Sequence, residues 1–168
     1  MPLRPVEPED LQLLYTIEND TELWEVSNNN GPYSHYALKQ YIANQASVYD
    51  SGEIRFIIDL RNNPQAPTQP IGIIDLINYS PLHARAEVCI ALLKEHRNQG
   101  YALQALHQLH HFATERLRIH SLYALISPHN ENSIQLFTKA QYKHTATLKE
   151  WLFSRGKYQN IDLFQHFF

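Results

Sequence analysis

The order of hydrophobic and polar positions along the chain predicts its elements. Short runs rich in β-branched and aromatic residues indicate strands, and apolar residues that recur every three or four positions indicate helices. We expect strands at residues 3–6, 54–60, 71–78, 85–93, 121–126, 142–153 and 158–167. We expect helices beginning at Pro8, running from Ser34 as N-cap to about Val48, and covering residues 101–117 and 130–139.

This order predicts an α+β fold in which helices flank a mixed, mostly antiparallel sheet. Strands that follow one another directly favour antiparallel pairing, whereas the strand–helix–strand unit around Gly100 favours a parallel or splayed pair. The proline-rich stretch at residues 61–70 is expected to be a surface loop of this fold. The length fits one compact domain over residues 1–168.

Composition and charge narrow the class of protein. The chain is 43% hydrophobic and 18% charged, which suits a packed core rather than disorder. The net charge of −3 argues against a nucleic-acid partner. No apolar run approaches the roughly 20 residues of a membrane span, and the first residues lack the pattern of a signal peptide. We therefore expect a cytoplasmic protein without a membrane partner. Its single cysteine, Cys89, is expected to be a buried structural thiol.

The turn after the fourth predicted strand has the properties of an anion site. The apolar run at residues 88–93 is followed by Arg97, Asn98, Gln99, Gly100, Tyr101 and Ala102, where a helical pattern begins. The first amides of a helix lack intrahelical partners and lie at the positive end of its dipole. This turn is therefore expected to bind a ligand that carries phosphate.

Four features together resemble the GNAT superfamily of acetyl-CoA-dependent N-acetyltransferases. They are the turn Arg97-x-x-Gly100-x-Ala102, the lead-in at residues 85–88, the Asn-rich start of the last helix at residues 127–137, and the aromatic closing hairpin with Trp151, Gly156 and Tyr158. The hairpin is similar to that of the branch that contains spermidine/diamine and ribosomal-protein N-terminal acetyltransferases. The resemblance is good from Ile71 onward and fair from Leu3 to Val48.

The resemblance implies acetyl-CoA as co-substrate and assigns residues to it. Backbone amides from Arg97 to Ala102 are expected to hold the pyrophosphate. The backbone of Ile90, Ala91 and Leu92 is expected to pair with the pantetheine arm, and one amide there to polarise the thioester carbonyl. Asn130 matches the family asparagine that contacts this arm, and Lys139 either meets a coenzyme phosphate or is simply solvated.

Phe137 departs from the family pattern. It stands where much of the family has a tyrosine that protonates the leaving thiolate, and phenylalanine has no proton to donate. A positioned acid contributes roughly 10²–10⁴-fold. Three alternatives follow for protonation of the thiolate. The proton comes through a water molecule, it comes from another tyrosine such as Tyr142 or Tyr33, or the enzyme is weakened.

Acidic residues are the candidates for the acceptor side. An ammonium group must lose a proton before it attacks, so a carboxylate is expected to act as base. Glu87 and Asp75 are the catalytic candidates, although Glu87 could instead pair with Arg85 or Arg97, and Asp75 could face solvent. The segment around Trp24 is acidic and contains Glu18, Asp20, Glu22 and Glu25. With the aromatic ring, these residues either favour a cationic acceptor or simply form a solvated face. Tyr33 and Tyr79 are further candidate substrate contacts.

The leading function is transfer of an acetyl group to a primary amine, with a polyamine or diamine slightly favoured as acceptor. A protein N-terminus of the ribosomal-protein type is the nearest alternative, and a non-catalytic acyl-CoA sensor is a third. His107 and His111 share a helix face but lack a third ligand, so no metal is expected. The aromatic C-terminal hairpin makes a homodimer a further possibility.

Overall fold

A computed structural model describes residues 2–24, 31–61, 65, 67–154 and 156–168. The elements are β1 (Leu3–Pro5), α1 (Leu11–Glu18), α2 (Thr21–Trp24), α3 (His35–Ala43), α4 (Val48–Ser51), β2 (Ile54–Leu60), β3 (Gln69–Ser80), β4 (Arg85–Leu92), α5 (Tyr101–Leu117), β5 (Ser121–Ile126), α6 (Glu131–Lys139), β6 (Lys143–Ser154) and β7 (Lys157–Phe167). Short 3-10 turns lie at Pro8–Asp10 and Lys94–His96. Every strand expected from the sequence is present.

Two helical segments differ from the prediction, and in both a polar side chain explains the difference. The helix that begins after Ser34 ends at Ala43 instead of near Val48, because Ser47 caps a separate turn, α4, by accepting a hydrogen bond from the amide of Tyr49. The short helix α2 was not expected. Its first turn is stabilised by Asp20, whose carboxylate accepts from the amide of Glu22 at 3.0 Å.

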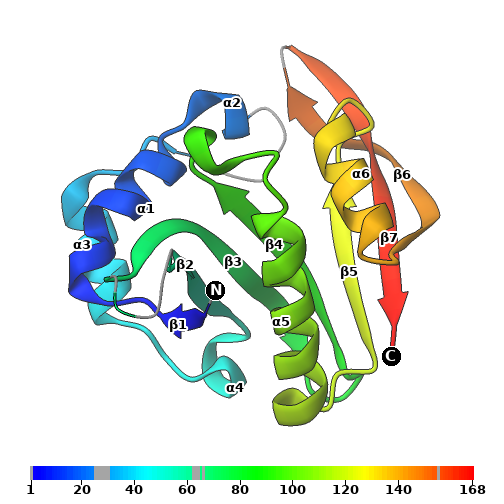
Figure 1. The fold of residues 1–168 in the computed structure, drawn as a ribbon. Coiled ribbons are helices and arrows are strands. Elements are labelled where there is room, and N and C mark those ends of the chain that lie inside the picture. The colour runs from blue at the N-terminus through cyan, green and yellow to red at the C-terminus, as the bar shows by residue number, and fades with distance from the viewer. Residues whose placement is uncertain (1, 25–30, 62–64, 66, 155) are drawn as a thin grey trace.

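The strands form one sheet in the order β1-β2-β3-β4-β5-β7-β6 (Figure 1). All neighbouring strands are antiparallel except β4 and β5, which are parallel. The mixed, mostly antiparallel sheet predicted from the sequence is therefore confirmed. No helix in the described part of the chain is both long and apolar enough to cross a membrane.

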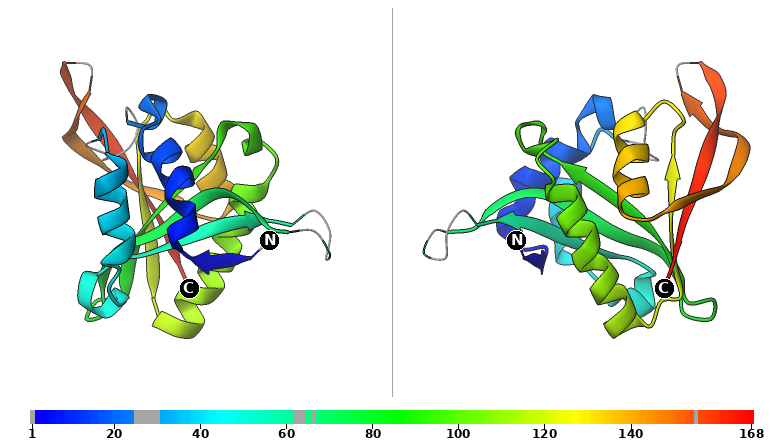
Figure 2. Two further views of the ribbon diagram at one scale, coloured as in Figure 1. Left: turned by 90° about the vertical axis from the view of Figure 1, so that its left-hand side faces the viewer. Right: turned by 45° about the vertical axis from the view of Figure 1, so that its right-hand side comes forward.

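Helices cover both faces of this sheet, and side chains of β3 alternate between them. Ile74 and Leu76 pack into the core under α5, whereas Ile73 packs into a smaller cluster with α1 and α3. The two views of Figure 2 show α1 and α5 on opposite sides of the sheet. Asp75 shares the face of Ile73 by alternation, so its carboxylate lies on the side of α1 and α3.

The β4–β5 pair is short, and the two strands then separate. They pair at three positions, Arg85 with Ser121, Ala86 with Leu122, and Glu87 with Tyr123. Beyond Glu87, β4 continues to Leu92 and pairs only with β3. The remaining backbone edge of β4 is thus open toward β5, and this opening positions the site described below.

Candidate active site

Two cavities meet at the open edge of β4. The donor cavity, of about 700 Å³, lies between this edge, the N-terminus of α5 and the start of α6. The acceptor cavity, of about 470 Å³, lies on the face covered by α1 and α3. Both are lined by Leu23, Ile90, Ala91, Asn130 and Ser133. Ligands bound in the two cavities therefore come into contact beside β4.

The turn that begins α5 presents free backbone amides to the donor cavity. Asn98 and Gly100 have φ angles of +60° and +84°, conformations that Asn and Gly tolerate best. Gly100 is the N-cap of the 17-residue helix α5 and offers no side-chain cap. The first amides of α5 are therefore free to bind a negatively charged group. This geometry fits the pyrophosphate predicted from the sequence.

The open edge of β4 fits the remainder of coenzyme A. Ile90, Ala91 and Leu92 line the donor cavity, and their strand pairs with β3 alone at these positions. An extended amide-containing chain can hydrogen-bond to such an edge as an added strand. Asn130 caps α6 by accepting from the amide of Ser133 at 3.1 Å, and Lys139 lines the same cavity. The residues present therefore fit the coenzyme.

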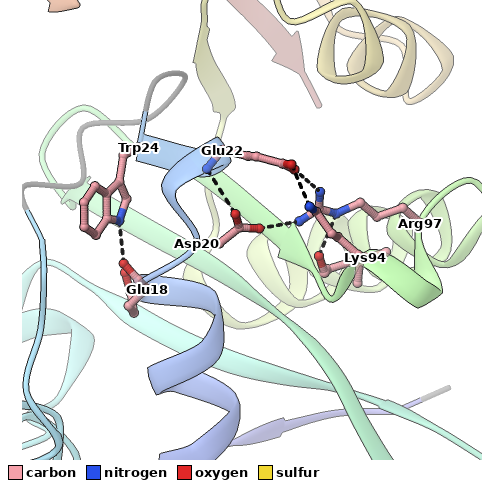
Figure 3. A network of polar contacts seen from close by, with 7 residues as sticks. Glu18, Asp20, Glu22, Trp24, Lys94 and Arg97 are labelled. Carbon is pink, nitrogen blue, oxygen red and sulfur yellow. Dashed lines mark hydrogen bonds and ion pairs between the residues drawn. The ribbon is translucent and has the colours of Figure 1, made fainter.

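Ion pairs connect the α5 turn to α2 (Figure 3). Arg97 Nη2 lies 3.0 Å from Asp20 Oδ2, and its Nε donates to the carbonyl of Leu92 at 2.9 Å. Glu22, which also lines the donor cavity, accepts from Lys94 Nζ at 2.6 Å and lies 3.7 Å from Arg97. Two cations beside the phosphate turn are thus already paired with carboxylates of the α2 segment.

A row of polar side chains crosses the acceptor cavity on three neighbouring strands. Arg55, Asp75 and Cys89 are cross-strand partners on β2, β3 and β4, and all three line the cavity. Arg55 donates to both oxygens of Asp75 at 2.9 and 2.7 Å, and to Glu18 at 2.6 Å. Its guanidinium also lies 5.2 Å from the ring centre of Tyr41. Asp75 therefore faces the cavity, in a bidentate ion pair.

Burial and charge shift the pKa values of these groups. Burial alone would lower the pKa of the Arg55 guanidinium, but Asp75 and Glu18 raise it well above its usual value. Burial raises the pKa of Tyr41 to about 12, so its hydroxyl stays protonated. Burial and the charges of Asp75 and Glu87 raise the pKa of the Cys89 thiol, which disfavours the thiolate.

Glu87 lies at the point where β4 and β5 separate. Its side chain is buried but lines the acceptor cavity. Burial raises the pKa of Glu87, and hydrogen bonds from Asn78 and Tyr123 partly oppose that rise. Arg97 pairs with Asp20 instead, so the structure does not support the alternative in which it pairs with Glu87. A carboxylate with a raised pKa in a cavity has the properties of a general base.

The tyrosines proposed as proton donors lie in different places. Phe137 is buried and lines the acceptor cavity, not the donor cavity expected for a coenzyme contact. Tyr142 packs edge-on against Phe137, but its hydroxyl is 3.1 Å from His110 Nε2, and it lines neither cavity. Tyr33 lines the acceptor cavity. Of the two tyrosines, Tyr33 is therefore the one placed near the reaction.

The surroundings of three residues differ from those expected; the roles expected of Tyr79 and Gln99 stay predictions. Cys89 is accessible to solvent because its side chain opens on the acceptor cavity, although enough protein surrounds the thiol to raise its pKa. Tyr79 lines neither cavity; it packs against Tyr49, and its hydroxyl contacts the carbonyl of Leu117 at the end of α5. Gln99 lines neither cavity and donates to the carbonyl of Glu95.

The acidic segment between the first helices is only partly placed at the acceptor cavity. Trp24 donates its indole N–H to the carbonyl of Glu18 and lines neither cavity, whereas Leu23 beside it lines both (Figure 3). The prediction for Glu25 lies outside the described residues. Asp20 and Glu22 bind cations of the α5 turn, so their charges act on the donor side.

Sequence reasoning missed three residues that contact the predicted carboxylates. Arg55 on β2 contacts Asp75, and Asn78 on β3 and Tyr123 on β5 contact Glu87. An arginine within the apolar strand at residues 54–60 is a signal that could have identified Arg55, since a buried cation requires a partner. In the part of the chain that the structure describes, His, Cys, Asp and Glu form no group suited to hold a metal.

Comparison with known proteins identifies the class to which this fold and site belong. Residues 1–143 match the family described as acetyltransferase (GNAT) domain. The chain therefore belongs to the GNAT family of acetyltransferases, whose co-substrate is acetyl-CoA.

Spermidine acetyltransferases are among the proteins whose sequences are similar to this chain. The chain is 23% identical to spermidine N(1)-acetyltransferase of Vibrio cholerae serotype O1 over 159 residues, which cover 95% of this chain and 88% of the relative. It is 24% identical to the same enzyme of Escherichia coli strain K12 over 167 residues, which cover 98% and 86%.

Solved structures of the V. cholerae enzyme share the fold. Its complex with CoA and spermine has a TM-score of 0.87 at 22% identity, covering 99% of this chain and 94% of that chain. A structure described as dodecameric has a TM-score of 0.79 at 23% identity, covering 99% and 92%.

Proposed function

We propose that this chain transfers the acetyl group of acetyl-CoA to a primary amine of a polyamine or diamine. One observation carries the proposal: a cavity lined with carboxylates meets the open edge of β4, beside a helix N-terminus suited to pyrophosphate. The names of the V. cholerae and E. coli relatives support the same acceptor class.

The charge of the acceptor cavity favours a cationic acceptor. Glu18, Asp75 and Glu87 line the cavity together with one cation, Arg55. Three carboxylates and one guanidinium leave a net charge of −2 when all are ionised. A ligand with two or more ammonium groups restores neutrality, and the ring of Tyr41 adds an apolar, electron-rich wall. A peptide N-terminus carries a single ammonium and matches this charge less well.

Glu87 is the proposed base. An alkylammonium has a pKa of about 10.4, so near pH 7 the acceptor arrives protonated. Glu87 accepts that proton, directly or through a water molecule, and the amine lone pair attacks the thioester carbonyl. The C–N bond forms, the C–S bond breaks and the coenzyme leaves as a thiolate. The nitrogen, cationic after attack, loses a second proton, which passes to the thiolate. A backbone amide at residues 90–92 is placed to stabilise the negative carbonyl oxygen.

Protonation of the leaving thiolate does not depend on Phe137 in this scheme. A thiol pKa of about 8.5 makes the thiolate a tolerable leaving group without an acid. Tyr33, which lines the acceptor cavity, is the proposed proton source. Asp75 acts as a binding carboxylate rather than as the base, because its two oxygens are engaged by Arg55.

Thiol release measured with acetyl-CoA and a panel of amines tests the proposal. The panel contains spermine, spermidine, a diamine, a monoamine of equal length and N-terminal peptides. We expect turnover with the polyamines and diamine, and at least tenfold lower kcat/KM with the monoamine. Coenzyme binding without thiol release for any acceptor would indicate a sensor, and a preference for peptides would indicate an N-terminal acetyltransferase. Either result overturns the proposal.

We also propose that the chain self-associates, on the strength of exposed aromatic residues on the β6–β7 hairpin. Trp151, Phe153 and Tyr158 are all more than half exposed. The dodecameric state described for the V. cholerae enzyme favours an assembly larger than the predicted homodimer. Light scattering coupled to size exclusion tests this; a monomer at micromolar concentration refutes it.

A further inference from the structure

Asn78 occupies an irregular position in β3. The register between β3 and β4 shifts between Ile77 and Ser80, and Asn78 has a φ of +53°. Strict alternation would place its side chain on the core side with Leu76. Instead, its Nδ2 atom donates to Glu87 Oε2 at 3.0 Å. The irregularity thus directs an amide toward the carboxylate of the proposed base.

Glu87 is held from a second direction by Tyr123. Tyr123 is the cross-strand partner of Glu87 and the last residue of β5 that pairs with β4. Its hydroxyl forms a hydrogen bond with the Glu87 carboxylate. Two donors from two different strands therefore fix a carboxylate that is 4% exposed and lines the acceptor cavity.

The backbone at Asn78 supports a role for its side chain. A positive φ is strained for most residues with a Cβ, and glycine adopts it most readily. Asparagine tolerates it and brings an N–H donor, which glycine lacks. The position therefore combines an unusual backbone conformation with a specific contact to Glu87.

We propose that Asn78, assisted by Tyr123, is a positioning residue that orients the Glu87 carboxylate toward the acceptor. The inference rests on the proposed role of Glu87 as base. Asn78 lines neither cavity, so it acts through Glu87 and not on the acceptor itself. Without the amide, the carboxylate loses a donor that favours its ionised form and gains freedom to rotate away from the amine.

Other titratable groups lie on the strands around Glu87. Tyr123 faces it from β5, the Arg55–Asp75 pair lies on β2 and β3, and Arg85 and Cys89 lie on its own strand. The α6 residues that line the acceptor cavity, Ser133 and Phe137, are uncharged. Asn78 is also hydrogen-bonded to Tyr123, so a change at Asn78 removes one contact of Tyr123 as well as one of Glu87.

Asn78→Gly is the central test, because it removes the amide and keeps the backbone conformation. We expect coenzyme affinity to be retained, kcat/KM for the amine to fall about tenfold, and the acidic limb of its pH profile to move to higher pH. Asn78→Asp should shift the limb further, since a second carboxylate faces Glu87. Ala84→Gly is the matched control: Ala84 also has a positive φ, +46°, and lines neither cavity.

An NMR titration of the Glu87 carboxyl carbon gives a readout that does not require activity. We expect a higher pKa in Asn78→Gly than in the parent chain, and a change in the same direction in Tyr123→Phe, which leaves β3 intact. Unchanged titration and unchanged kcat/KM in Asn78→Gly overturn the inference.

Glu87→Gln separates failure of this inference from failure of the proposed function. If Glu87→Gln is inactive while Asn78→Gly behaves as the parent chain, only the positioning role is refuted. If Glu87→Gln retains full activity, Glu87 is not the base, and both proposals fall.

Discussion

Loss of Arg55 is expected to destabilise the protein and to alter its acceptor cavity. The change Arg55→Met removes one guanidinium that donates to Asp75 at 2.9 and 2.7 Å and to Glu18 at 2.6 Å. The three side chains are 16%, 9% and 15% exposed, so solvent screens these contacts little. Methionine preserves most of the aliphatic bulk but leaves both carboxylates without this cation.

Removal of one partner from a buried ion pair costs about 3–5 kcal/mol. Asp75 lines a cavity that water can enter, which favours the lower end, about 3 kcal/mol. For a chain of this size, each kcal/mol lowers Tm by roughly 2–4 °C. We therefore expect Arg55→Met to lower Tm by roughly 6–12 °C. Arg116→Met, an exposed change on α5, should alter stability by less than about 0.5 kcal/mol.

A double-mutant cycle measures the coupling. Urea unfolding of the parent chain, Arg55→Met, Asp75→Asn and the double variant should give a coupling energy of about 1–3 kcal/mol. Spermine should raise the Tm of Arg55→Met more than that of the parent chain, because an ammonium can replace the lost guanidinium. A cost below about 1 kcal/mol for Arg55→Met, with additive single changes, would refute the reasoning.

Three further predictions concern other parts of the molecule. Phe137→Tyr should raise kcat several-fold if thiolate protonation limits the rate; an unchanged kcat indicates that another group or water already serves. Glu22→Gln should tighten coenzyme binding a few-fold in calorimetry at low salt, because exposed pairs are worth about 0.2–1 kcal/mol and the change frees Lys94 for phosphate, while Arg97 stays paired with Asp20. Burial, together with the neighbouring histidines 107 and 166, lowers the pKa of His110 to about 4. Its neutral form therefore stabilises the fold above the unfolded pKa of about 6.5, and this contribution is lost as the pH falls toward 4. His110→Leu should flatten the decline of Tm across that range, and an unchanged slope contradicts the assignment.

Local signals in the sequence were sufficient for much of the fold and the donor site. The pattern at residues 101–117 reproduces α5 to the residue, and Ser34 caps α3 as predicted. Gly100 indicated the turn because glycine adopts a positive φ most readily, and Gly100 has a φ of +84°. Strand and helix periodicities act over short distances, which is why these predictions succeeded.

The acceptor side depends on contacts between distant strands, which periodicity does not encode. The pairing of Arg55 with Asp75 requires the β2–β3 register, and the exposure of Cys89 requires the separation of β4 from β5. The position of Tyr79 depends in the same way on distant contacts, because it packs against Tyr49 and donates to the carbonyl of Leu117 at the end of α5. An apolar run such as residues 88–93 predicts that its side chains are buried. It does not indicate that a cavity opens beside one of them.

The three-pair junction between β4 and β5 has a consequence for the lifetime of the protein. The sheet consists of two halves, β1-β2-β3-β4 and β5-β7-β6, whose strands pair from Arg85 to Glu87 and from Ser121 to Tyr123. Ala84, just before β4, adds backbone hydrogen bonds to His120 and Ser121. A coenzyme that bridges this gap binds the folded state alone and stabilises it by about 2.7 kcal/mol at a hundred times its Kd. We therefore expect limited proteolysis of the chain to slow when acetyl-CoA is added, because the ligand lowers the population of opened states.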